Sequence, residues 1–414
     1  MTEEENRSFE HWDRWHEEGL YEEFTSAIDS IADLPKLQAV HIRISDRCHG
    51  DPNYDYCWES GTELISTRLQ TLEAVFRSIE ARVAQKKADN GVEITTVTSL
   101  AIQNLQNNPL PDFIASDTFQ SVAKNLTDLR LLVAEECNES GPDHDLGCEE
   151  RRAFEPWLQN ALLPVFANQL TTLHLAFNEY WGVTPGYFDG KGLVFPNLKT
   201  LTLGQYVIGH HDQFDWVLAQ HSLETLRLDQ CEIVTYLNFL HKSSTNEGQL
   251  AEWNVPTHDW IRYPEWSFGF GERETAFMFP GTWEAVFDNI RTQLPNLVDL
   301  RMENQDRRQG HAFNRADRMR CTLSCLRYIT LDTGLLSSPW IAARVHGGDG
   351  PGDMAFGNND PAVVPLAERD QNQYVPKATL DRVKETFEGD SRAFNDLVRS
   401  VETRRAQRGL YTLA

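Results

Sequence analysis

Hydrophobic residues follow a distinctive spacing in residues 223–233, which read LETLRLDQCEI. The apolar residues occupy the first, fourth, sixth, ninth and eleventh positions of this stretch. Leu226 and Leu228 alternate with polar residues, as side chains do along a strand that is buried on one face. Cys231 follows where the chain turns inward, and its small thiol can pack there and make a weak hydrogen bond. The stretch therefore predicts one strand that ends in an inward turn.

The same spacing recurs along the chain, so the pattern is a repeat. Its eight copies begin at Leu37, Val97, Leu126, Leu170, Leu198, Leu223, Leu297 and Leu326. Where the spacing is clean, successive copies are 25 to 29 residues apart, which leaves room for one strand and one helix. The sequence predicts an α/β leucine-rich-repeat solenoid, with parallel strands on the concave face and helices on the convex face. The alternative is an ordinary α/β domain with leucine-rich strands.

Helical spacing fills the intervals between the predicted strands. Apolar residues recur every three or four positions over residues 62–85, which predicts one helix with a single buried stripe. Shorter helices are expected at 116–125 and 151–169. Another is expected at 212–221, with Asp212 as its N-cap because a short carboxylate can accept from the first free amides.

Composition divides the chain into four parts. These are an acidic capping segment at 1–33, the repeats at 34–343 with an aromatic-rich insertion at 235–287, a Gly/Asp/Pro linker at 344–376, and a helical segment at 377–414. We expect most tryptophans of the insertion to pack against the repeats, since ten exposed aromatic residues would form an unusually large apolar patch. In the last segment, Asp390 or Ser391 is expected to cap a final helix.

The charge of the chain excludes some classes of ligand. A formal net charge of −24 does not provide the basic footprint that duplex DNA or an anionic membrane requires. It is compatible with basic protein partners, or simply with solubility. No apolar run reaches the roughly 18 residues of a membrane-spanning helix, and the N-terminus does not read as a secretory signal. Seven irregularly spaced cysteines do not form a disulfide framework, so a cytoplasmic or nuclear location is expected.

Candidate residues for catalysis or metal binding are few. Cys48, His49 and Cys57 lack the close cysteine pairing typical of structural zinc sites, so we expect no metal and no cofactor. The glycine-rich residues 347–357 lack the Gly-Lys-Ser/Thr ending of a phosphate loop. Histidine and aspartate residues cluster at 210–221, but no Gly-x-Ser-x-Gly motif or other activated nucleophile accompanies them. We therefore expect a binding protein, with a hydrolase centred on 210–221 as the alternative.

The strand faces carry the candidate binding residues. In each copy the residue between the fourth and sixth positions points away from the core, so the copies form one row. This row reads His41, Ala101, Arg130, His174, Thr202, Arg227, Arg301 and Thr330. Two positions later, the last three copies place the acids Asp229, Glu303 and Asp332. The arginines of the row are expected to face solvent. The row is either a surface that docks a polypeptide or a set of solvated ion pairs that contribute little.

Trp260 and Trp266 of the insertion are also expected to contact a partner at the edge of the repeats, because tryptophan side chains often dominate binding energy. Together with the row, they complete the predicted binding surface for a protein substrate.

Several longer stretches resemble a known family. The sequence FPNLKTLTLGQYVIG, the following HHDQFDWVLAQHSLETLRLDQCEIV, the later TWEAVFDNIRTQLPNLVDLRM and the closing DSRAFNDLVRSVETRR are similar to the leucine-rich-repeat region of filamentous-fungal F-box proteins. The resemblance implies a substrate receptor of a cullin–RING ubiquitin ligase, with a Skp-type adaptor and a cullin as further partners. Residues 1–33 depart from the family, because they lack the helical pattern of the F-box. A stand-alone scaffold or inhibitor is the alternative function.

Overall fold

The computed structural model describes most of the chain as a mixed α/β structure. The described residues are 22–46, 48–49, 63–87, 94–135, 149–184, 186–240, 256–263, 274–303, 318–323, 327–332, 345–346, 363–367 and 370–410. Trp266 and the glycine-rich residues 347–357 lie outside them. Within the described residues, no helix combines the length and apolarity needed to cross a membrane.

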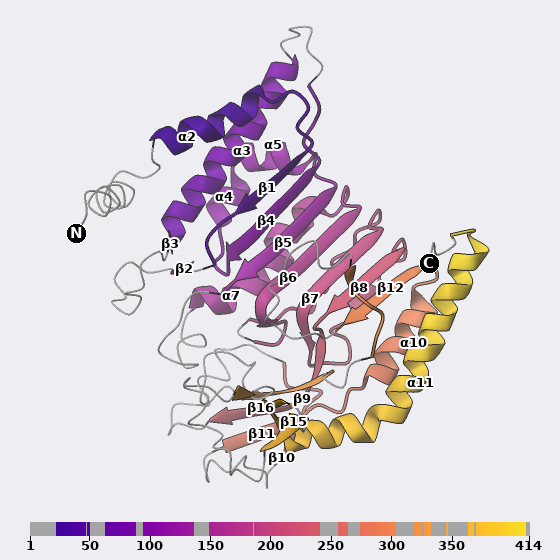
Figure 1. Ribbon diagram of the computed structural model, residues 1–414. Helices are drawn as coiled ribbons and strands as arrows, with labels where there is room; N and C mark the ends of the chain where they lie inside the picture. The colour runs from indigo at the N-terminus through magenta and orange to yellow at the C-terminus, as the bar shows by residue number, and fades with distance from the viewer. Residues whose placement is uncertain are drawn as a thin grey trace.

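A mostly parallel sheet forms the centre of the protein. Its strands are β1 (Ala39–Arg43), β4 (Ser99–Gln106), β5 (Asp128–Ala134), β6 (Thr172–Trp181), β7 (Thr200–Ile208), β8 (Thr225–Asp229) and β12 (Asp299–Glu303), paired in parallel in that order. They lie side by side with their arrowheads pointing the same way (Figure 1). Seven of the eight strands predicted from the leucine spacing therefore stand in one row.

The register of these strands follows the leucine spacing. Leu173 pairs with Leu201, which pairs with Leu226, and the leucines two residues later pair in the same way. All six of these side chains have an exposed fraction of zero. The predicted burial of these leucines on adjacent parallel strands is confirmed. A shift of one residue would turn every leucine to the other face, so their burial holds the register.

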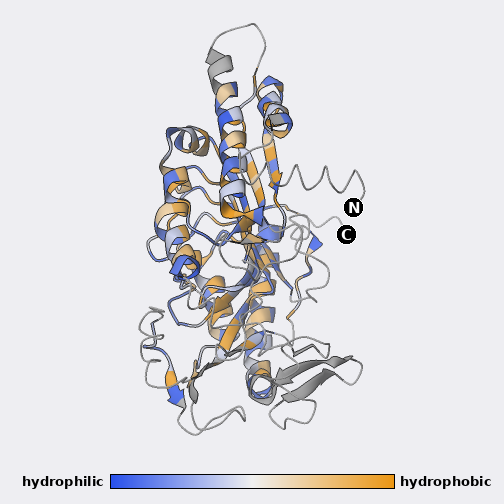
Figure 2. Cartoon of the chain, turned by 90° about the vertical axis from the view of Figure 1, so that its left-hand side faces the viewer, coloured by the Kyte–Doolittle hydropathy of each residue, from blue (hydrophilic) through white to orange (hydrophobic). Residues whose placement is uncertain are grey.

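Helices cover one face of the sheet. They include α3 (Ile65–Lys87), α4 (Pro111–Ala115), α5 (Asp117–Ala123) and α7 (Glu149–Trp157). Phe76 of α3 stacks on Phe119 of α5 with 5.3 Å between ring centroids, and Phe113 of α4 packs edge-on against both rings. Figure 2 shows the helices and the sheet as adjacent layers. The apolar faces of both layers meet in one continuous core.

Left-handed residues occur at the same level of three strands. Asn104, Gln205 and Gln230 all have positive φ angles, of 65°, 58° and 54°. Residues other than glycine and asparagine rarely adopt this conformation. Gly204 and Asp229, which precede two of these residues, are paired with each other in the sheet. After Gln230 the chain leaves β8 and begins β9 (Glu232–Leu240), which pairs with the last two residues of β7.

Beyond this turn the sheet becomes mixed, and one prediction fails. Strand β9 pairs antiparallel with β11 (Glu274–Met278), which pairs with β10 (Ile261–Tyr263). The eighth copy of the pattern forms β13 (Tyr328–Asp332), but β13 pairs with β9 and not with β12. The hydroxyl of Thr235 in β9 also donates to the carbonyl of Ile329 at 3.0 Å. This buried bond helps to hold β13 away from the row that its spacing predicted.

Two helices begin or end at other residues than the sequence predicts. The helix expected at 212–221 is only α8 (Asp215–Leu218), whose N-cap is Phe214, so Asp212 does not cap it. The helix expected at 151–169 ends as α7 at Trp157 and continues as a π turn and a 3-10 turn that contains Pro164. The proline ring and its missing amide explain the tighter last turn.

The C-terminal segment is one helix instead of two. Helix α11 (Lys377–Gln407) runs without a break for 31 residues and lies along α10 (Trp283–Gln293), as Figure 1 shows. Asp390 is fully buried within α11 and is not an N-cap. Its Oδ1 instead accepts from the amide of Glu284 in the first turn of α10 at 2.8 Å. A tertiary contact thus uses the carboxylate that the sequence pattern assigned to a local cap.

The two ends of the described chain contain further short elements. Before the first strand lie α2 (Glu22–Asp29) and a 3-10 turn (Ser30–Asp33), and β2 (Cys48–His49) pairs with β3 (Glu63–Leu64). In the segment predicted as a linker, β14 (Val345–His346), β15 (Val363–Ala367) and β16 (Asp370–Pro376) pair as a small antiparallel sheet. Part of the predicted linker therefore has regular backbone pairing.

Candidate functional site

The predicted row of face residues lies in register across the sheet. His41 pairs with Ala101, Ala101 with Arg130, and Arg130 with His174. The same line continues through Thr202 and Arg227 to Arg301. Because side chains alternate along a strand, these residues point to the face opposite the buried leucines. We call this line of residues, from His41 to Arg301, the central row.

Two arginines of the central row, Arg130 and Arg301, are held by neighbouring carboxylates. Arg130 donates from Nε and Nη2 to the two oxygens of Asp128, at 3.1 and 3.0 Å. Arg301 donates from Nε to Asp299 at 3.1 Å. The side chains of Arg130 and Arg301 are 33% and 36% exposed, so they face solvent in part while their guanidinium groups are paired with aspartates. The sequence carries a signal for these pairs, because Asp128 and Asp299 each lie two residues before the arginine.

One end of the central row is covered. The carbonyl of Met319 accepts from Arg301 at 3.3 Å, and the amide of Arg320 donates to Glu303 at 3.1 Å. Asp229 and Glu303 are buried, with exposed fractions of 7% and 6%, contrary to the prediction of surface acids. The chain continues beside β12, where the amide of Thr322 donates to the carbonyl of Met302 at 2.9 Å and Cys321 forms a parallel bridge with Met302.

Three other residues predicted for the binding surface are not found beside the central row. Asp332 lies on β13 and pairs with Asn238 of β9, so it does not stand beside Glu303. Trp260 is buried, and its indole N–H donates to the carbonyl of Gly209 at 2.7 Å. The expectation that insertion tryptophans pack inward is confirmed for Trp260 and for Trp283, which is fully buried. Trp266 lies outside the described residues.

The opposite end of the central row is more open. His41 and its neighbour Arg43 are exposed on β1, while Ala101, Arg130 and His174 are partly exposed. This end therefore presents imidazole and guanidinium groups in a protein whose net charge is −24. Such groups can donate hydrogen bonds to carboxylates, and arginine does so with two parallel bonds.

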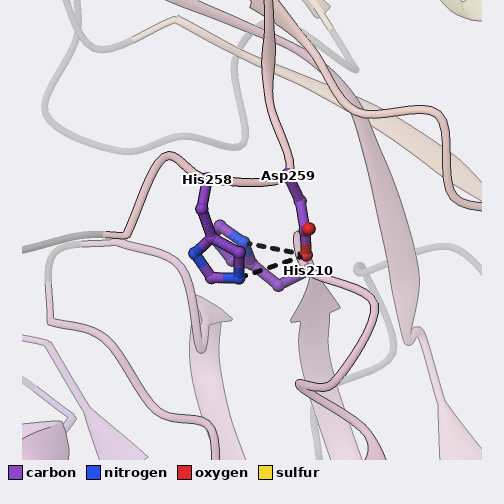
Figure 3. A group of neighbouring side chains, drawn as sticks. All are labelled: His210, His258 and Asp259. Carbon is purple, nitrogen blue, oxygen red and sulfur yellow. Dashed lines mark ion pairs between the residues drawn. The ribbon is translucent and has the colours of Figure 1, made fainter.

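A second group of polar residues lies where β7 ends. His210 lies two residues after the end of β7, and His258 and Asp259 reach it from the insertion (Figure 3). The Oδ2 atom of Asp259 lies 3.5 Å from Nδ1 of His210 and 3.5 Å from Nε2 of His258. The amide of His211 donates to the same oxygen at 3.0 Å. His210 lies in the predicted histidine and aspartate cluster at 210–221, whereas its two partners lie 48 and 49 residues further along the chain and were not predicted.

Aromatic contacts fix the ring of His210. It stacks on Trp260 with 5.1 Å between centroids and on His258 with 5.0 Å. Tyr187 packs edge-on against it at 5.5 Å. Burial lowers the pKa of His210, and His258 lowers it further. For Asp259, burial raises the pKa, but the His211 amide and the nearby histidines outweigh that effect and lower it.

The predicted hydrolase alternative gains no nucleophile from this region. A cavity of about 150 Å³ lies beside the group and is lined by His210, His211, Asp215 and Thr282, among others. Its described lining contains no serine or cysteine. The hydroxyl of Thr282 accepts from the amide of Ala285 and caps α10. The histidines therefore have no activated oxygen or sulfur nucleophile beside them in the described residues.

Comparisons with known proteins give no relative. No protein-family model matches the sequence, and no curated protein and no solved structure is significantly similar to it.

Proposed function

We propose that the protein is a recognition module that binds a polypeptide on the face of its sheet opposite the helices. The observation that carries this proposal is the in-register central row, which aligns His41, Arg130 and His174 within four consecutive strands, with Ala101 between the first two. We interpret the sheet as the concave face of a leucine-rich-repeat solenoid. The recurring left-handed backbone conformation at Asn104, Gln205 and Gln230 supports this interpretation, because equivalent positions of repeats adopt equivalent conformations.

The chemistry of the open end favours an acidic segment as the bound partner. From β1 to β6 the row crosses three inter-strand spacings, or roughly 14 Å at about 4.8 Å each. An extended peptide covers this distance with about four residues. Carboxylates on such a peptide can meet Arg130 and Arg43, while the overall negative charge of the protein repels acidic chains elsewhere. Complementarity of this kind sets specificity and the association rate more than affinity.

The covered end of the row limits where binding takes place. Arg301 and Glu303 bind backbone groups of Met319 and Arg320, and both Asp229 and Glu303 are buried, so this end of the row offers a partner little accessible charge. We therefore place the recognition surface on β1, β4, β5 and β6. Arg227 and Arg301 extend the same line but are assigned to its covered half.

The setting that we propose is substrate recognition in an F-box type cullin–RING ubiquitin ligase, in line with the family resemblance of the repeats. A stand-alone scaffold or inhibitor uses the same surface without binding the adaptor. The two settings differ in one measurable property, which is recovery of a Skp-type adaptor and a cullin with the protein.

The test is affinity purification of the full chain with mass spectrometry of the proteins that co-purify. The variant Arg43→Glu/Arg130→Glu reverses two cations at the open end of the sheet. Its matched control, Lys384→Glu/Arg399→Glu, makes the same change in charge at two side chains of α11 that are each 76% exposed. Circular dichroism melting curves verify that both variants remain folded.

We expect the amount of each wild-type partner that co-purifies to fall at least about tenfold with the sheet variant Arg43→Glu/Arg130→Glu. The control variant should recover the same amount as the wild type. If the folded sheet variant retains every partner of the wild type, the row is only a set of ion pairs and the proposal is wrong. Adaptor and cullin in the same eluate favour the ligase setting; partners without them favour the scaffold.

A further inference from the structure

We propose that His210, His258 and Asp259 form a binding site for one divalent transition-metal ion, with Zn²⁺ as the first candidate. Two imidazoles and one carboxylate are ligands that zinc accepts, and three protein ligands with an open fourth position are typical of zinc sites that keep a bound water. This inference is independent of the proposed recognition function, because the group lies at the end of β7 and not on the central row.

The distances between the three ligand atoms fit one ion. Zinc lies about 2.0–2.2 Å from histidine nitrogen and carboxylate oxygen, so tetrahedral ligand atoms stand roughly 3.4 Å apart. Oδ2 of Asp259 is 3.5 Å from the nearest nitrogen of each histidine, and all three ligand atoms lie within 4.8 Å of one another. The side chain of His258 is 59% exposed, so its ring can turn onto an ion while His210 and Asp259 stay in place.

The buried histidine supplies a second, independent observation. His210 has an exposed fraction of zero, and in the described part of the chain neither of its ring nitrogens makes a well-aligned hydrogen bond; the nearest acceptor is Oδ2 of Asp259, 3.5 Å from Nδ1. An imidazole buried without such partners is costly, and buried polar groups are normally satisfied. A bound cation would satisfy Nδ1, which already points toward Asp259 (Figure 3).

The surroundings of the site hold two of the ligands in place. Trp260 stacks on the ring of His210, and the Trp260 indole is itself fixed by its bond to the carbonyl of Gly209. The amide of His211 donates to Asp259 and orients the carboxylate. Contacts of this kind, outside the ligands themselves, commonly tune metal affinity. The exposed side of His258 leaves the fourth position to solvent.

An ion at this site would join two segments that are distant in sequence. His210 belongs to the end of a central strand, whereas His258 and Asp259 belong to the turn that precedes β10. Binding would therefore hold the insertion against the sheet. Because an ion that binds only the folded chain stabilises it, the melting temperature should rise with metal concentration.

The experiment uses the full chain without a histidine tag, freed of metal by chelation and dialysis, and titrated with Co²⁺ and then Zn²⁺. The visible absorption of Co²⁺ reports tetrahedral coordination, and calorimetry gives the stoichiometry and Kd for Zn²⁺. The variants are His258→Ala and Asp259→Asn, and the matched control is His221→Ala, which removes an exposed histidine elsewhere. Melting curves with and without Zn²⁺ give a second readout.

We expect one equivalent of metal in the wild type and the control, and a Kd at least about tenfold weaker in both ligand variants. The increase in melting temperature with Zn²⁺ should disappear in the same two variants. Absence of stoichiometric binding to the wild type would overturn the proposal. Unchanged binding in both ligand variants would also overturn it, because the ion would then occupy another place.

Discussion

The buried carboxylate of Asp390 connects the C-terminal helix to the rest of the protein. Its Oδ2 accepts from Nε of Arg327 at 2.8 Å and from the hydroxyl of Tyr328 at 2.9 Å. Its Oδ1 accepts from the amide of Glu284 at 2.8 Å. The Arg327 and Asp390 side chains both have an exposed fraction of zero. Three elements, β13, α10 and α11, therefore depend on one charged group.

Replacing Asp390 with alanine should destabilise the protein by roughly 3–5 kcal/mol, because it removes one partner of a buried ion pair and leaves the Asp390 contacts of Arg327, Tyr328 and Glu284 unmade. Arg327 also donates to the carbonyl of Val383 and the hydroxyl of Thr386, and both of these acceptors are neutral. Asp390→Asn retains an acceptor of the same shape and should cost less. The double variant Arg327→Met/Asp390→Leu removes both charges, so we expect it to recover part of the loss.

The assay is urea unfolding followed by tryptophan fluorescence and circular dichroism. Asp396→Ala is the control, because Asp396 lies on the same helix and its side chain is 49% exposed. Its free energy of unfolding should change by no more than about 0.5 kcal/mol. A loss below about 1 kcal/mol for Asp390→Ala would contradict the argument, and so would a double variant less stable than the single one.

Two further predictions concern the core. Burial raises the pKa of Glu155 from its ordinary value of 4.5 to about 8, so between these pH values the folded state retains a proton that the unfolded chain has lost. The contribution of Glu155 to the free energy of unfolding is therefore fully present below pH 4.5 and is lost as the pH rises toward 8. In this pH range the free energy of unfolding of the wild type should fall by about 1.4 kcal/mol per pH unit relative to that of Glu155→Gln. Parallel stability–pH curves for the two proteins would refute this. Leu203→Ala should lower the free energy of unfolding, measured in urea, by ~2–5 kcal/mol because Leu203 is fully buried. The control Val194→Ala, at a side chain that is 53% exposed, should change it by less than about 0.5 kcal/mol. Equal effects of the two variants would contradict the assigned core.

The spacing of leucines was sufficient to predict the row of parallel strands. Leu173, Leu201 and Leu226 occupy equivalent positions of the pattern, and they pair directly in the sheet. The alternation of side chains along a strand then determined which residues share the opposite face. This part was predictable because it depends on local periodicity, which each strand carries in its own sequence.

Contacts between distant segments were not predictable in the same way. Asp390 has the local signature of a helix cap, yet Arg327 and Glu284 bind it across more than 60 residues. The two partners of His210 lie in an insertion with no spacing that relates them to β7. Glu303 reads as an exposed acid on its strand, and only the position of Arg320 shows that it is covered. Such contacts follow from how segments pack, which a single sequence does not display.

Strands β8 and β12 pair directly although a long stretch of chain separates them. From Leu198 to Leu223 the interval is 25 residues, and from Leu223 to Leu297 it is 74, yet the register across both steps is the same. Loop-closure entropy grows only with the logarithm of length, so the longer interval costs about 1 kcal/mol more. One buried leucine offsets that amount. The sheet can therefore accept new segments between its strands without losing its alignment, and residues 230–298 are such a segment.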